Sequence, residues 1–180
     1  MAGPSATAGR DSPRIDRAVL EDIGDRLRTT PQFDSATIVT ADGQTLLFTR
    51  SVRKSLNSPR VDEDIYYSTH DGTEWRTAEP LPGAINSPAN EGTVTVTPDG
   101  LYMILARCPR GQRCALYAAK KKRGRWLQPI RLPDPLNDFR SWTSQPSLSY
   151  DGRTLYFASN RPGGYGGADV WRSTFDPENG

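Results

Sequence analysis

The chain has 180 residues, a net charge of +2 and a hydrophobic content of 35%. A chain of this length can bury the core of one domain. The charge is too small to indicate an acidic polymer such as a nucleic acid as the partner. No apolar run approaches the roughly 20 residues that a membrane-spanning helix needs. We therefore expect neither a nucleic-acid-binding nor a membrane-spanning protein.

Residues 1–30 follow a helical pattern. Apolar side chains recur there at four-residue spacing after a Ser-Pro pair typical of a helix start, at Ile15, Val19, Ile23 and Leu27. We predict a tail followed by a short amphipathic helix. The stretch contains no apolar run of about 7–15 residues, so the pattern predicts no secretory signal within it.

One segment recurs three times along the rest of the chain. Its copies read ATIVTADGQTLLFTR from residue 36, TVTVTPDGLYMILAR from residue 93 and PSLSYDGRTLYFASN from residue 146. Each copy places an Asp-Gly pair between runs of alternating apolar and polar residues. This is a strong signal for a β-hairpin, because Asp and Gly both tolerate the positive φ of a tight turn.

Further strands follow the hairpins in the same order. Third strands are predicted at 64–67, 115–117 and 169–171, and Trp75 and Trp126, which lie 51 residues apart, open a short fourth strand. Four strands in about fifty residues match one blade of a β-propeller. We predict an all-β fold of just under three four-stranded antiparallel blades, at 31–88, 89–140 and 141–180.

The third predicted blade lacks its outer strand. Natural proteins avoid such an unpaired edge, and propellers need about 4–8 blades. We expect the remaining blades to come from a longer chain or from self-association.

The segments INSPANEGTVTVTPDG, DEDIYYST and SQPSLSYDGRTLYFASNRPGGYGGADVW, together with the Trp after each third strand, carry a family resemblance. They resemble the WD-repeat-like propeller units of the TolB-type family over roughly residues 31 to 175. Similar units occur in bacterial cell-envelope proteins that also carry an OmpA-type domain. The resemblance implies a non-catalytic module, periplasmic or in the cell envelope, that binds a protein, peptide or glycan and needs no cofactor.

The order of strands indicates where the ligand-binding residues lie. In a four-stranded meander, the loop between the second and third strands lies on the same side as the linker to the next blade, opposite the Asp-Gly turns. Loops 50–63, 107–114 and 160–168 therefore gather with the linkers, and binding residues usually occupy such loops. The candidate ligand-binding residues are Arg50, Arg107, Arg161, Tyr165, Asp34 and Glu91.

Three of these candidates are arginines near equivalent places in the three copies, where they could together hold a carboxylate or a sulfate. The alternative is that they are solvent-exposed residues at strand ends. Asp34 and Glu91 also occupy equivalent places, where the third copy has Thr143.

Cys108 and Cys114 flank a five-residue loop in the second blade. Their spacing suits a disulfide, and similar paired cysteines occur at this loop in the cell-envelope relatives. Two free thiols in a cytoplasmic protein are the alternative. A zinc site would need two more ligands, so no metal is predicted.

The remaining motifs give weaker signals. The Gly-rich loop 161–167 precedes a strand, which does not suit a phosphate-binding loop, and the basic run 120–125 falls on a hairpin. An enzyme of the sialidase type or another propeller glycosidase is the alternative function, because residues 68–75 resemble an aspartate box. That box needs a residue between Asp and Gly, whereas Asp71 and Gly72 are adjacent.

Overall fold

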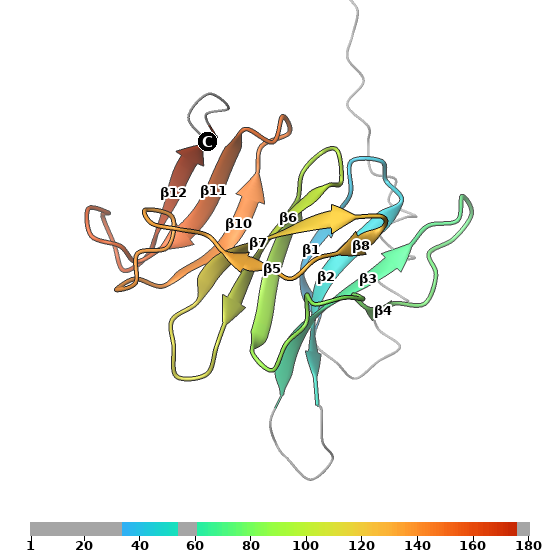
Figure 1. The fold of residues 1–180 in the computed structure, drawn as a ribbon, viewed down its shortest axis with the longest axis horizontal. Coiled ribbons are helices and arrows are strands. Elements are labelled where there is room, and N and C mark those ends of the chain that lie inside the picture. Colours follow the sequence, from blue (N-terminus) through green and yellow to red (C-terminus); the bar gives the residue numbers. More distant parts are fainter. Residues whose placement is uncertain (1–33, 54–60, 176–180) are drawn as a thin grey trace, which may run out of the picture. The chain divides into compact units, whose positions relative to one another are not determined.

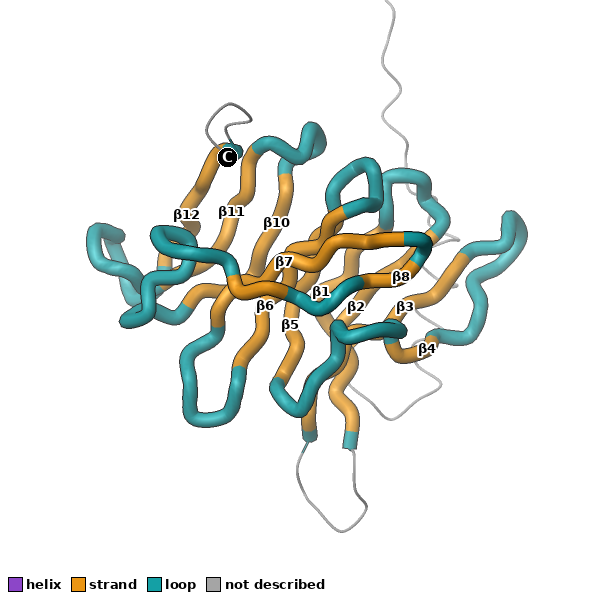
Figure 2. Tube along the Cα trace, in the orientation of Figure 1, coloured by secondary structure: helices purple, strands orange, loops and turns teal. Residues whose placement is uncertain are grey.

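The structure, a computed structural model, describes residues 34–53 and 61–175. In these ranges the chain forms twelve strands in three antiparallel sheets and no helix. Figures 1 and 2 show how the sheets follow one another. The predicted all-β class is confirmed. The helix predicted within residues 1–30 lies outside the described residues. Within the described ranges, no helix is long and apolar enough to cross a membrane.

Strands that follow each other in the chain also pair with each other. The first sheet contains β1 (Asp34–Val39), β2 (Thr45–Val52), β3 (Asp62–Thr69) and β4 (Glu79–Pro80). The second contains β5 (Asn90–Val96), β6 (Tyr102–Cys108), β7 (Ala115–Lys122), β8 (Arg125–Trp126) and β9 (Ile130–Arg131). The third contains β10 (Thr143–Leu148), β11 (Thr154–Ser159) and β12 (Asp169–Thr174). The blade boundaries stay a prediction.

The outer strand of the first two sheets is divided into short pieces. In the second sheet, β8 and β9 both pair with β7. In the first sheet, Trp75 forms an isolated bridge with His70, and β4 pairs with β3 a few residues later. Each tryptophan therefore lies at the start of the outer, fourth strand, as predicted. A break in the pairing separates it from the next short piece of that strand.

The three Asp-Gly turns share one hydrogen-bond pattern. A Thr or Ser hydroxyl donates to the carboxylate two residues later, and that carboxylate also accepts the backbone N–H two residues beyond it, at Asp42, Asp99 and Asp151. The glycines have φ values of 70°, 69° and 69°. Positive φ is thus confined to the glycine of each pair. The aspartate instead stabilises the turn through its side chain.

The hydrophobic core lies between neighbouring sheets. Leu47 and Ile65 of the first sheet pack with Val94, Met103 and Leu105 of the second. A second cluster joins the second sheet to the third, through Ala106, Leu116, Leu155 and Phe157. Each sheet thus buries side chains against the next, which a period-two strand pattern allows because alternate residues face opposite sides.

The corresponding face of the third sheet is exposed. The strand register makes Ile65, Leu116 and Val170 equivalent, because they pair with Thr49, Ala106 and Ala158 at the same place in the second strands. Ile65 and Leu116 are 0% exposed, whereas Val170 is 78% exposed. The third sheet therefore presents to solvent the face that the other two sheets bury.

An asparagine side chain fastens each linker to the sheet before it. The Asn86 amide accepts a hydrogen bond from the Ile65 N–H and donates to the Ile65 carbonyl. Asn137 makes the same two bonds with Leu116 and also donates to the Leu132 carbonyl. A side-chain amide has one acceptor and two donors, so it can pair with a strand backbone as another strand would.

Replacing Asn137 by alanine is expected to lower the free energy of unfolding by about 2 kcal/mol, because it leaves the buried Leu116 N–H without a partner. The Leu116 carbonyl keeps its bond from the Leu132 N–H. Asn160→Ala is the control: Asn160 is exposed, and its side chain accepts one bond from the Trp142 N–H. Urea denaturation of the full chain would measure both. Equal losses for the two variants would contradict the role given to Asn137.

Candidate binding face

The longer loops lie at the ends of the sheets opposite the Asp-Gly turns (Figure 1). The Thr143 N–H donates to the Cys114 carbonyl, joining loop 107–114 to the start of β10. Arg161, in loop 160–168, donates to the carbonyls of Pro135 and Leu136 in the same linker. Loop 50–63 lies partly outside the described residues. We call the surface formed by the loops at 108–114 and 160–168 and the linker at 132–142 the loop face.

The acidic candidates pair with the arginines opposite them in the sheet. Asp34 faces Arg50 in the register of β1 and β2, and Glu91 faces Arg107 in β5 and β6. Arg50 donates to both Asp34 carboxylate oxygens, at 2.7 and 2.8 Å. The Arg107 Nε donates to Glu91 at 2.7 Å.

These arginines are buried. Arg50 is 6% exposed and Arg107 is 8% exposed, so the alternative of solvent-exposed strand-end arginines was wrong for these two. Arg161 is partly exposed. Their guanidinium groups lie over the aromatic rings of β3 and β7, 4.8 Å from the centre of the Tyr66 ring and 5.0 Å from that of Tyr117. Such contacts add cation–π attraction to the ion pairs.

The third sheet reaches the same arrangement with different residues. The register places Thr143 opposite Ser159, where the first two sheets have an acid and an arginine. Arg161 lies two residues after Ser159, and its guanidinium is 5.4 Å from the Trp171 ring centre. Trp171 holds the place in the third sheet that Tyr66 and Tyr117 hold in the first two. It donates to the Leu136 carbonyl as Arg107 donates to the equivalent carbonyl of Ile85.

Arg107 and Arg161 thus hold the second and third sheets to the linkers that precede them, whereas Arg50 pairs with Asp34 within the first sheet. The structure does not show them converging on one point, and their guanidinium groups donate to groups within the protein. A role for Arg50, Arg107, Arg161, Asp34 and Glu91 in holding a ligand stays a prediction.

Burial and pairing have opposite effects on the ionisable groups. Burial raises the pKa of Glu91, although hydrogen bonds from Ser87 and the charge of Arg107 oppose the rise. The hydrogen bond to Asp34 raises the pKa of Arg50, whereas burial lowers that of Arg161.

Two of the loops on this face are fixed in place. Cys108 and Cys114 form a disulfide, which confirms the predicted pair and closes the loop at 109–113. In the Gly-rich loop, the Asp169 carboxylate accepts the backbone N–H groups of Tyr165 and Gly166. A Cβ at Gly164 would collide with that carboxylate, so a larger residue there would require the Asp169 side chain to move. Two amides that a phosphate would need are therefore already used by Asp169.

Phe139 is the residue on this face that sequence reasoning missed. Its side chain is 76% exposed, with the Arg140 guanidinium 5.4 Å from its ring centre. It lines two shallow depressions, one shared with Arg113 and Arg131 and the other with Arg161. Its position two residues after Asn137 is the signal that could have found it, since Asn137 fixes the linker there. Tyr165, predicted as a site residue, is fully exposed on the Gly-rich loop.

Among the described residues, no three or more His, Cys, Asp or Glu side chains are grouped so that they could hold a metal ion. The one histidine, His70, lies on a turn of the first sheet, where its Nδ1 accepts the Gly72 N–H.

No family model matches the sequence, and no curated protein matches it. Among solved structures, the chain is similar to a puromycin-hydrolysing peptidase of Mycobacterium tuberculosis, with a TM-score of 0.56 and 13% identity over 82% of this chain and 22% of the peptidase. It is also similar to TolB of Acinetobacter baumannii, with a TM-score of 0.49 and 18% identity over 81% of this chain and 31% of TolB. A third similar structure, titled as a putative TolB of Agrobacterium tumefaciens, has a TM-score of 0.45 and 18% identity over 81% of this chain and 59% of that protein.

The chain spans less than two thirds of each of these proteins. At such identities a likeness concerns the fold, and fold alone does not assign an activity.

Arg107→Ser is expected to destabilise the protein by about 3 kcal/mol at pH 7, because it leaves a buried Glu91 carboxylate without its cation. The double variant Glu91→Thr with Arg107→Ser, which copies the Thr143–Ser159 pair of the third sheet, should recover most of that loss. Urea denaturation at pH 7 and at pH 5 would measure both.

The loss of stability in Arg107→Ser should depend on pH, because the pKa of Glu91 is raised. A group whose pKa is raised by folding favours the folded state when protonated, and this contribution is lost as the pH rises through the raised value. Removing Arg107 raises the pKa further, so the Arg107→Ser defect should shrink as the pH falls toward 5. A defect that is independent of pH and unchanged in the double variant would contradict a buried charge as its cause.

Proposed function

We propose that the chain is a non-catalytic binding module of the β-propeller type, which recognises a partner protein, peptide or glycan through its loop face. The observation that supports this most directly is Phe139, an exposed aromatic side chain between two depressions that are lined by arginines. Aromatic residues and arginines dominate the binding energy of protein interfaces.

The loops around Phe139 support the proposal because they are held in place before any partner binds. The disulfide closes one loop, Asp169 holds the second, and Asn137 and Arg161 fix the linker that carries Phe139. A preordered surface loses less conformational entropy on binding, which favours affinity. The ionisable residues nearby serve the fold, which is the reason for proposing binding in place of catalysis.

The exposed face of the third sheet supports a propeller completed by further sheets of the same repeat. Val170 and Tyr156 are exposed there, whereas the equivalent Ile65 and Leu47 of the first sheet are buried against the second. We propose that these further blades come from a longer chain or from self-association. A solution mass above that of one chain would support self-association, and a monomer would leave the longer chain as the source.

A periplasmic or other cell-envelope location is part of the proposal. The Cys108–Cys114 disulfide supports it, because thiols in the cytoplasm are mostly kept reduced. A count of thiols by mass spectrometry on the protein from its native compartment should find none, and two thiols would contradict this location.

Phe139→Ala is expected to weaken partner binding by about thirtyfold or more, the loss typical of a central aromatic residue. Peptides selected from a random displayed library on the full chain, or sugars that bind in a glycan array, would supply the ligand. Tyr150→Ala is the matched control, because Tyr150 is 94% exposed on an Asp-Gly turn at the opposite end of the sheets.

Two results would contradict the proposal. One is that no ligand is selected, or that Tyr150→Ala weakens binding as much as Phe139→Ala does. The other is turnover of a glycoside by the purified chain at a rate that is abolished by changing one carboxylate, which would support the glycosidase alternative.

A further inference from the structure

A cavity of about 310 Å³ lies between the first and second sheets, on the side of the Asp-Gly turns. It is therefore separate from the loop face. Small-molecule sites usually measure roughly 300–1,000 Å³, so this volume suits a single small ring and not a long chain.

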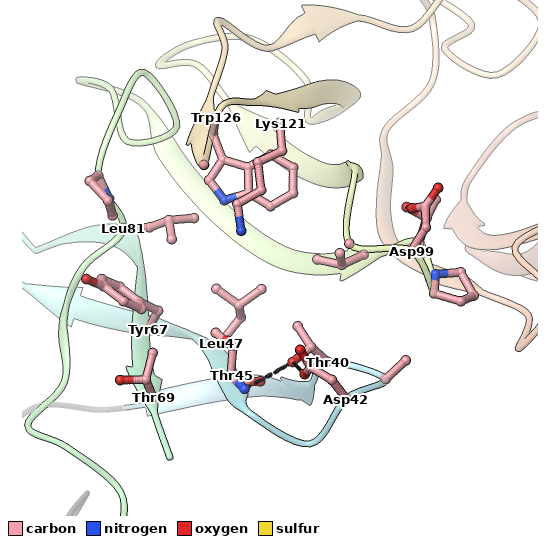
Figure 3. Close-up of a pocket in the computed structure, with 17 residues that line it drawn as sticks. Thr40, Asp42, Thr45, Leu47, Tyr67, Thr69, Leu81, Asp99, Lys121 and Trp126 are labelled. Atoms are coloured by element: carbon pink, nitrogen blue, oxygen red, sulfur yellow. Dashed lines mark hydrogen bonds between the residues drawn. The ribbon is translucent and has the colours of Figure 1, made fainter. Parts of the chain in front are cut away.

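Part of the cavity wall is aromatic and aliphatic. Tyr67 of β3 and Trp126 of β8 line it, together with the core residues Leu47 and Leu81. Figure 3 shows the Trp126 indole and the Lys121 side chain on one side of the cavity, with Leu47 and Thr40 across from them. Because the outer strand of the second sheet brings Trp126 over the first sheet, the wall depends on contact between the two sheets.

Two carboxylates border the cavity, from equivalent turns of the two sheets. Asp42 and Asp99 each use Oδ1 to hold their own turn. In the part of the chain that the structure describes, neither Oδ2 atom has a hydrogen-bond partner. Hydrogen bonds from Thr40 and Thr97, then from the backbone of Gln44 and Leu101, lower the pKa of the two groups. Both therefore remain ionised acceptors at neutral pH.

Donors face the same space. The Lys121 Nζ lies 5.3 Å from the Trp126 ring centre, and its charge also contributes to the lowered pKa of Asp42. Neither Lys121 Nζ nor Trp126 Nε1 makes a hydrogen bond to another described residue. The cavity thus combines two carboxylate acceptors, two donors and two aromatic rings.

We infer that this cavity is a binding site for one neutral sugar ring. A pyranose has faces of C–H groups that pack on aromatic rings, and its rim of hydroxyl groups both donates and accepts hydrogen bonds. The sugar hydroxyl groups would donate hydrogen bonds to Asp42 and Asp99. They would accept hydrogen bonds from Lys121 and Trp126. A small cation would meet the Lys121 ammonium, and an anion would meet two carboxylates, so an uncharged polyol ring fits the charges best.

The test is saturation-transfer NMR on the full chain with glucose, galactose and N-acetylglucosamine at millimolar concentrations, and with choline and acetate as charged rivals. At least one neutral sugar should receive saturation, and titration should give its dissociation constant. Asp99→Asn and Lys121→Met should each weaken binding by about tenfold or more, the loss expected for a hydrogen bond to a charged group.

Asp151→Asn is the matched control, because Asp151 makes the same turn on the third sheet but does not line the cavity. Thermal unfolding of all three variants would show whether they fold, and Lys121→Met leaves every turn bond intact. The inference would be overturned if none of the sugars bound, if choline or acetate bound in their place, or if the cavity variants bound as well as Asp151→Asn.

Discussion

The arrangement of the three sheets depends on how each linker is fastened to the strand before it. The fourth strand of the first two sheets is short, so the N–H and carbonyl groups on the outer side of the third strand need other hydrogen-bond partners from the linker. Asn86 and Asn137 supply these partners with a side-chain amide that forms the same pair of bonds as a strand backbone. Because the bond fixes the linker, it also fixes where the next sheet starts and which face meets the core.

The arginines extend this fastening to the loop face. Arg107 and Arg161 hold equivalent carbonyls at Ile85 and Leu136, next to the two asparagines. The third sheet keeps this bond although its strand pair is Thr143 and Ser159. The second and third sheets therefore make the same bond to a linker carbonyl, although the arginine that makes it stands at a different position in each repeat. This indicates that the repeat maintains the anchoring of its linkers. The charged residues of the loop face are therefore largely occupied, and Phe139 and Tyr165 are left as its exposed aromatic side chains.

The sequence was sufficient to predict the strands, because apolar and polar residues alternate along them and each hairpin contains an Asp-Gly pair. It also predicted Cys108 and Cys114 as partners. It was not sufficient to predict the role of the arginines. A strand-end arginine has the same pattern whether it faces solvent, a ligand or a carboxylate on the adjacent strand, and the pairing of Arg50 with Asp34 depends on strand register. The register shifts at the bulges between Ser35 and Ile38 and between Gly92 and Val94, where a sequence gives no clear signal.

The cavity beside Trp126 could not be predicted for a similar reason. Its walls come from two sheets, and Tyr67 and Lys121 are distant in sequence. Its location on the turn side also runs against the rule that binding residues occupy the longer loops. Two faces of this fold therefore carry separate hypotheses, one for a macromolecular partner and one for a sugar.

The most direct test of this account is hydrogen exchange at the Ile65 and Leu116 amides under native conditions. Both donate to an asparagine side chain and are held by no backbone strand at that position. If the asparagines fasten the linkers, these amides should exchange only through global unfolding, as slowly as those of the central strands. Exchange at the rate of the Asp-Gly turns would show that the linkers open locally, and it would contradict the account.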